Sequence, residues 1–167
     1  MTRDFRSLPD PSPEVTPSSI LVRLVDALGF RLHWATEGLR PEDVSFAPPG
    51  GGMGIRAQME HLHGVMGFTA ASLGAGDPGD PPEDFEALRA RVFALLGEIR
   101  ARLEGMNNDD VACIQIKRRG NDLPVWNMIH GPLADALTHV GQINALRRIS
   151  GNPARKVNYL VGEIVRS

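Results

Sequence analysis

The sequence contains a single cysteine, Cys113, so no disulfide can form within the chain. We therefore expect the reducing conditions of the cytoplasm as its setting. Cys113 also lacks an expected helix N-terminus or a neighbouring base, either of which would stabilise a thiolate. A nucleophilic role for this thiol is therefore not favoured.

Basic residues are not in excess, and lysine occurs only as Lys117 and Lys156. Eighteen Lys and Arg residues against 20 Asp and Glu residues leave a net charge of −2. This balance argues against a nucleic-acid partner, because such a protein needs positive charge to displace counterions from phosphates. No run of about 18 apolar residues is present, so we expect no membrane-spanning helix. Residues 1–7 are polar and do not resemble a secretory signal.

The remaining composition is that of a folded globular protein. Hydrophobic residues make up 42% of the 167 residues and charged residues 23%, which suits one domain with a sizeable core. Residues 1–15 are polar and contain Pro9, Pro11 and Pro13, so we predict a flexible N-terminal arm there. Residues 16–167 are predicted to form a single domain.

Apolar residues recur at helical spacing in several long segments. The first segment begins at Thr16-Pro17, an N-cap followed by a proline at the first helical position, and stops at Gly38 and Pro41. Further helices are predicted at residues 55–73, 83–104 and 131–150. The residues expected to face inward in the first three helices are Leu21, Leu24, Val25, Leu28, Leu32, Ala35, Ile55, Met59, Leu62, Met66, Phe85, Leu88, Val92, Leu95, Leu96, Ile99 and Leu103.

Four amphipathic helices joined by modest loops can bury their apolar stripes only against one another. The sequence therefore predicts an all-α, antiparallel up-down four-helix bundle. We also predict a small hairpin near residues 111–120, closed around residues 119–122, and a short extra C-terminal helix after Asn152-Pro153. The glycines at 50–52 belong to a connector, because no strand precedes them and the GxxxxGK[ST] pattern of a phosphate-binding loop is absent.

Other conspicuous side chains have plain structural interpretations. Trp34 and Trp126 are expected to be core or interface aromatics, since only 5% of the chain is aromatic. Arg147 and Arg148, at the end of the last predicted helix, are expected to complement the helix dipole, with anion binding as the alternative.

Asp135 and His139 are four residues apart on the last predicted helix, so their side chains lie on the same face. Apolar residues surround them in the sequence, which places the pair on or beside the buried stripe. A buried carboxylate without a partner is costly, so Asp135 should be paired or act as a ligand. Two ligands at this spacing can share a metal ion, and an ordinary Asp–His hydrogen bond is the alternative.

His61 lies on the flank of the apolar face of the second predicted helix. In an antiparallel bundle the second and fourth helices can face each other, which would bring His61 to Asp135 and His139. Two imidazoles and one carboxylate with open coordination positions suit zinc, nickel, iron(II) or manganese. His63 lies about 200° further around the same helix, so it cannot easily bind the same ion.

These residues resemble two motifs of the DinB/YfiT-like superfamily. The segment His130-Gly-Pro-Leu-Ala-Asp135-Ala-Leu-Thr-His139-Val-Gly-Gln142-Ile resembles the motif of its last helix, where a histidine precedes a Gly-Gln pair. Met59-Glu-His61-Leu resembles the histidine site of its second helix. Family members usually present three histidines to a divalent metal, and Asp135 stands where the first histidine of the last-helix pair would be.

The resemblance implies a divalent metal held by His61, Asp135 and His139, with zinc or nickel ahead of iron or manganese. A carboxylate in place of an imidazole shifts the site toward harder ions and lowers the net charge of the site by one. Gln142, one turn beyond His139, is expected to support that ligand or to tie the backbone. His130 is expected either at the edge of the pocket or as a surface histidine at the helix end.

The resemblance also implies a metal-dependent enzyme. Characterised relatives include thiol S-transferases that use bacillithiol, mycothiol or glutathione, and maleylpyruvate isomerases. We therefore expect a transferase acting with a low-molecular-weight thiol, or a hydrolase, of unassigned substrate and with a homodimeric assembly. The alternative is a non-catalytic bundle that acts as a stress-associated binding or dimerisation module, with a purely structural polar cluster.

Overall fold

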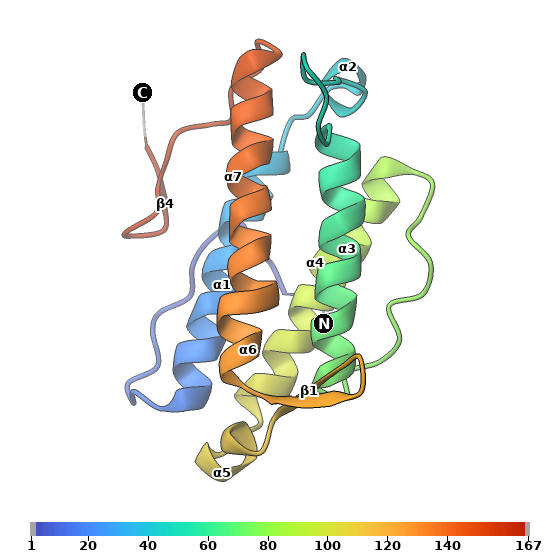
Figure 1. The fold of residues 1–167 in the computed structure, drawn as a ribbon. Helices are drawn as coiled ribbons and strands as arrows, with labels where there is room; N and C mark the ends of the chain where they lie inside the picture. The colour runs from blue at the N-terminus through green and yellow to red at the C-terminus, as the bar shows by residue number, and fades with distance from the viewer. Residues whose placement is uncertain (1–2, 166–167) are drawn as a thin grey trace.

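The computed structural model describes residues 3–165 and is mostly helical. The four long helices are α1 (Pro17–Thr36), α3 (Ile55–Ser72), α4 (Phe85–Glu104) and α7 (Ala134–Ile149). They lie side by side, with α1 and α3 each packed against both α4 and α7 (Figure 1). Shorter segments are α2 (Pro41–Val44), α5 (Asn108–Ala112), α6 (Trp126–Met128), the π-helical turn η1 (Ile129–Leu133), β1 (Gln115–Arg118), β2 (Asn121–Pro124), β3 (Val157–Asn158) and β4 (Glu163–Ile164).

The predicted start of the first helix is confirmed by its cap. The Thr16 hydroxyl accepts a hydrogen bond from the Ser19 amide at 3.1 Å, and the Ser19 hydroxyl accepts one from the Thr16 amide at 2.9 Å. Pro17 follows at the first helical position, where its missing N–H leaves no hydrogen bond unmade. Asp84 caps α4 in a similar way, accepting from the Ala87 amide at 2.8 Å.

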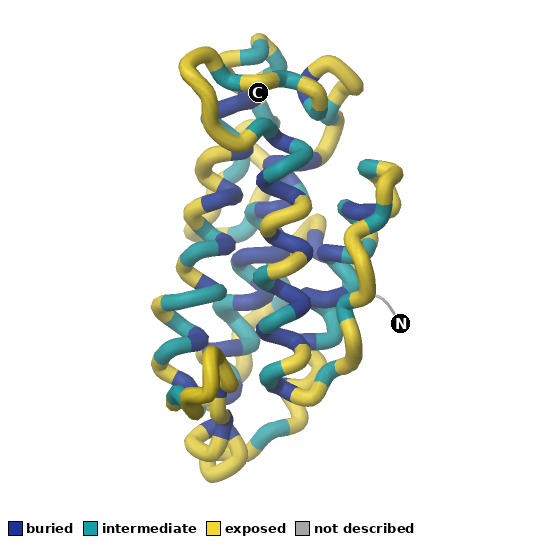
Figure 2. Tube along the Cα trace, turned by 45° about the vertical axis from the view of Figure 1, so that its right-hand side comes forward, coloured by how far each residue is buried: buried dark blue, intermediate teal, exposed yellow. Residues whose placement is uncertain are grey.

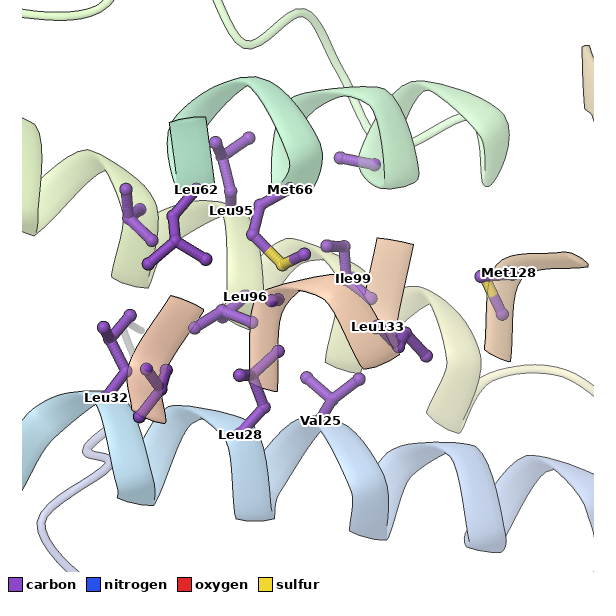
Figure 3. Close-up of a cluster of buried hydrophobic side chains, with 14 of the residues drawn as sticks. Val25, Leu28, Leu32, Leu62, Met66, Leu95, Leu96, Ile99, Met128 and Leu133 are labelled. Carbon is purple, nitrogen blue, oxygen red and sulfur yellow. The ribbon is translucent and has the colours of Figure 1, made fainter. Parts of the chain in front are cut away.

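The apolar stripes of the four long helices meet in one core, which Figure 2 shows as the buried inner sides of the helices. Figure 3 shows side chains from α1, α3 and α4 together with Met128 of α6 and Leu133 of η1, which precede the last helix. The labelled residues are Val25, Leu28, Leu32, Leu62, Met66, Leu95, Leu96, Ile99, Met128 and Leu133, all at most 1% exposed. Within residues 3–165, no helix combines the length and hydropathy that a bilayer crossing requires.

The predicted C-terminal helix is wrong, because the segment forms a small antiparallel hairpin. Val157 of β3 pairs with Ile164 of β4, and the intervening turn leaves Leu160 88% exposed. Apolar residues at helical spacing misled the prediction. The turn is set instead by Asn158, whose side chain accepts from the Leu160 amide at 3.0 Å, and by Gly162, whose φ is +72°.

The predicted hairpin near 111–120 exists, but it lies further along the chain. Val111 is helical within α5, because Asn107 caps that helix and accepts from the Asp110 amide at 2.9 Å. The strands are β1 and β2, joined by Arg119 and Gly120, which both have positive φ. This is the backbone of a tight two-residue hairpin turn.

The N-terminal segment is more firmly attached than predicted. Residues 3–15 form no regular helix or strand, but Phe5 is only 3% exposed and its ring stacks on Phe93 with centroids 5.8 Å apart. A Cβ on Gly29 of α1 would lie 2.1 Å from the Phe5 ring, so the ring packs directly on the helix backbone. The ends of the predicted arm and domain, residues 1–2 and 166–167, lie outside the described residues.

The two tryptophans differ. Trp34 is buried and its indole N–H donates to the Arg6 carbonyl at 3.2 Å, which confirms a core role. Trp126 is 69% exposed, so a core position within this chain is wrong for it. Arg147, which was predicted to complement the helix dipole, is buried at 2% exposure, and its guanidinium donates to the Ala35 and Glu37 carbonyls at the end of α1.

Truncation of Phe5 tests the attachment of the N-terminal segment. We expect Phe5→Ala to lower the free energy of unfolding by roughly 3 kcal/mol, since it empties a buried aromatic site. Leu160→Ala, at a mostly exposed position, is the matched control and should change stability little. Urea unfolding measures both variants. Equal urea midpoints for Phe5→Ala and the wild-type protein would show that packing of Phe5 contributes nothing to the stability of the fold.

Asp43 anchors the connector between α1 and α3 to the end of α7. Its buried carboxylate accepts from the Arg40 guanidinium at 2.8 and 2.9 Å, from the Ser150 hydroxyl at 2.8 Å and from the Asn152 amide at 2.6 Å. The hydrogen bonds from Arg40 dominate, and the pKa of Asp43 is held well below its usual range. The connector is therefore fixed at the end of the molecule where α1 ends.

The lowered pKa of Asp43 makes this contribution pH-dependent. The stabilisation is present above the unfolded pKa of about 4 and is lost as the pH falls below it. We expect Asp43→Asn to destabilise the protein at pH 7 by roughly 1–3 kcal/mol, the usual cost of weakened buried hydrogen bonds. The difference from wild type should shrink at pH 3. Glu42→Gln, on an exposed neighbouring carboxylate, is the control, and a pH-independent difference would contradict the assignment.

Candidate metal centre

The packing of α3 against α7 brings His61 to Asp135 and His139. The Nε2 atom of His61 lies 2.9 Å from Oδ2 of Asp135, and Nε2 of His139 lies 3.5 Å from Oδ1 of the same carboxylate. The two imidazole rings are tilted by 50°, with centroids 4.3 Å apart. One ligand atom from each residue lies within 4.8 Å of the other two.

These separations fit a metal ion. A tetrahedral ion with bonds of about 2.1 Å holds its ligand atoms about 3.4 Å apart. The distances of 2.9 and 3.5 Å, which run to different oxygens of Asp135, lie on either side of that value, and one ligand atom from each residue lies within 4.8 Å of the others, so the three side chains could hold an ion after they rearrange. Two imidazoles and one carboxylate are also the ligand types that zinc, nickel and iron(II) accept.

The three side chains differ in their surroundings. His139 is 9% exposed, whereas the side chains of His61 and Asp135 are 41% and 45% exposed. Burial lowers the pKa of His139, and the neighbouring His61 lowers it further, while Asp135 opposes the shift. A neutral imidazole is the form that binds a metal, so burial favours the ligand-competent state of His139.

Gln58 of α3 holds His139 in place. Its side-chain oxygen contacts Nδ1 of His139, and its amide nitrogen donates to Gln142 at 2.7 Å and to the Met53 carbonyl at 3.3 Å. The Nδ1–H group of His139 can therefore donate a hydrogen bond to Gln58. In that tautomer Nε2 carries no proton and faces Asp135 with its lone pair. Such hydrogen bonds behind a metal-binding histidine fix its tautomer and ring orientation.

An open cleft of about 930 Å³ runs past His61 and Asp135. It lies between α3, the β1–β2 hairpin and the segment that leads into α7. His139 does not line this cleft. It borders a separate shallow groove together with Gln58 and Gln142 on the side of the connector.

The chain enters α7 through an irregular turn. We predicted that this helix starts near Gly131-Pro132, but regular α-helix begins at Ala134. The preceding turn η1 contains Pro132, which has no N–H to donate, and Gly131 has a non-helical ψ of −108°. Turns of this type often occur at functional sites, and here Asp135 is the second residue after the turn.

The other predicted site residues are also placed. Gln142 accepts a hydrogen bond from the Gln58 amide at 2.7 Å, and hydrogen bonding to Gln142 is also one of the interactions that raise the pKa of His139. His130 is exposed and lines the cleft, so it is both a surface histidine and a cleft residue. His63 is 3% exposed, lies outside the His–Asp–His cluster, and its Nε2 makes no hydrogen bond within residues 3–165.

Two residues at this site were not predicted. Gln58 lies three positions before His61, close to it on the same helix, and that spacing was the available signal. Arg118 lines the cleft only because the hairpin folds back over α3, which the sequence alone did not indicate.

Comparisons of the chain with protein-family models, with curated proteins and with solved structures gave no match. The DinB/YfiT-like resemblance therefore stays a prediction from the motifs.

Gln58 can be tested as a positioning residue. We expect Gln58→Leu to weaken zinc binding by about 10–100-fold, the usual effect of losing a partner behind a metal-binding histidine. Gln142→Ala removes only the outer amide and should weaken binding less. Isothermal titration with zinc, together with a thermal unfolding curve for each variant, measures this. Unchanged zinc affinity in folded Gln58→Leu would rule the role out.

Proposed function

We propose that the chain is a DinB/YfiT-like antiparallel four-helix bundle that binds one divalent metal ion through His61, Asp135 and His139. The observation that carries the proposal is the convergence of these three side chains from two helices beside an open cleft. The motif around His130–Gln142 and the arrangement of four long helices support the same family. Zinc or nickel is the expected metal, and the carboxylate also admits iron or manganese.

The activity that fits this arrangement is metal-dependent transfer or hydrolysis. A divalent metal, when bound, would lower the pKa of a coordinated thiol or water. The transferase reading follows the resemblance and takes a low-molecular-weight thiol as one substrate; hydrolysis needs only water.

The residues around the ligands have separate tasks in this proposal. Burial lowers the pKa of His139 and so favours its neutral form, while Gln58 orients its imidazole ring. His61 and Asp135 present their outer edges to the cleft, where a substrate has access to them. The apolar cleft residues Val65 and Phe68 exclude part of the water from that side.

A non-catalytic bundle is the alternative, and one contact favours it. The 2.9 Å contact between His61 and Asp135 is already a good hydrogen bond without any ion, and both side chains are partly exposed. In that case the cluster would join α3 to α7, and the molecule would act as a binding or dimerisation module.

Metal analysis separates the two proposals. We expect the wild-type protein to bind about one equivalent of zinc or nickel and His139→Ala to lose at least tenfold in affinity, because it removes one of three ligands. His130→Ala is the matched control, since this histidine lines the same cleft outside the ligand set. Equal metal binding by His139→Ala and the wild-type protein would exclude the site.

A further inference from the structure

The cleft beside the metal ligands is lined by both apolar and polar side chains. The apolar ones include Val65 and Phe68 of α3 and Ile116 and Leu123 of the hairpin. Further polar ones are Arg118, Asn127 and His130. A volume of about 930 Å³ is in the range of small-molecule sites.

Arg118 is the cation of this cleft that lacks a carboxylate partner. Within residues 3–165, no Asp or Glu oxygen lies within 4.0 Å of its guanidinium. The acidic residues of the cleft are otherwise engaged: Glu60 pairs with Arg56 at 2.9 Å, and Asp135 contacts His61. The positive charge of Arg118 is therefore available to a ligand.

Arg118 is also held in position. Its backbone belongs to the β1–β2 ladder, opposite Asn121 and next to the tight turn. Its guanidinium carbon lies 5.6 Å from the centroid of the Phe68 ring, so the side chain extends over α3 rather than into solvent alone. A guanidinium stacked on a ring keeps its N–H edge free for a planar anion.

We infer that the cleft binds a small organic monocarboxylate, with its carboxylate on Arg118 and its apolar body between the hairpin and α3. A single charge is favoured, because Arg118 is the one Arg or Lys side chain among the residues that line this cleft. As an assignment of substrate class this rests on the proposed function, since the other end of the ligand would reach His61 and Asp135. The anion site itself does not require the metal.

The test uses 4-phenylbutyrate and its neutral counterpart 4-phenylbutan-1-ol as probes. Both are titrated into metal-free protein by isothermal titration or by NMR, so that coordination of the acid to a metal cannot contribute. We expect wild-type protein to bind the acid about fivefold more tightly than the alcohol, which corresponds to about 1 kcal/mol. Arg118→Gln should lower this ratio to about one and leave the affinity for the alcohol unchanged.

Arg119→Gln is the matched control. Arg119 is the adjacent residue with the same charge, and it does not line the cleft. We expect this variant to keep the wild-type preference for the acid. Three outcomes overturn the inference. The preference for the acid could be retained in Arg118→Gln, it could be lost equally in both variants, or it could be absent from the wild-type protein.

Zinc binding by the same variants separates this inference from the proposed function. Arg118→Gln should bind zinc as the wild-type protein does, because Arg118 is not in the ligand set. If zinc binding fails while the preference for the acid follows Arg118, the metal proposal falls and the anion site stands. If zinc binds but Arg118→Gln keeps the preference for the acid, the anion site falls and the metal proposal stands.

Discussion

The packing of α3 against α7 is the constraint on which the candidate site depends. His61 comes from α3, and Asp135 and His139 come from α7. The cluster therefore exists only while the two helices keep their register along the bundle axis. Gln58 reinforces the same register, since it reaches from α3 to both His139 and Gln142 of α7. The polar contacts and the buried stripe therefore select one alignment of the two helices.

Much of the helical fold could be predicted from local chemistry. The Thr16 cap, Pro17 and the apolar stripe that follows define α1 through neighbours in the chain alone. The spacing of Asp135 and His139 similarly placed both on one helix face. Where short polar residues compete with an apolar pattern, the prediction failed: Asn158 and Gly162 turn the C-terminal segment into a hairpin although its apolar residues are spaced as in a helix.

The parts of the site that were missed depend on tertiary contacts. A glutamine side chain is common both on surfaces and in cores, so Gln58 gave no signal by its residue type. Its contact with His139 follows only from how α3 and α7 are aligned. The place of Arg118 over Phe68 depends on where the hairpin closes. The ligand types were readable in the sequence, whereas their surroundings were not.

The contact between the N-terminal segment and the C-terminal hairpin couples two parts of the chain that are far apart in the sequence. A Cβ on Gly162 would lie 2.7 Å from the Leu8 side chain, so the C-terminal hairpin rests directly on the N-terminal segment. The N-terminal segment and the C-terminal hairpin therefore shield one another from water, and a substitution in either one exposes part of the other.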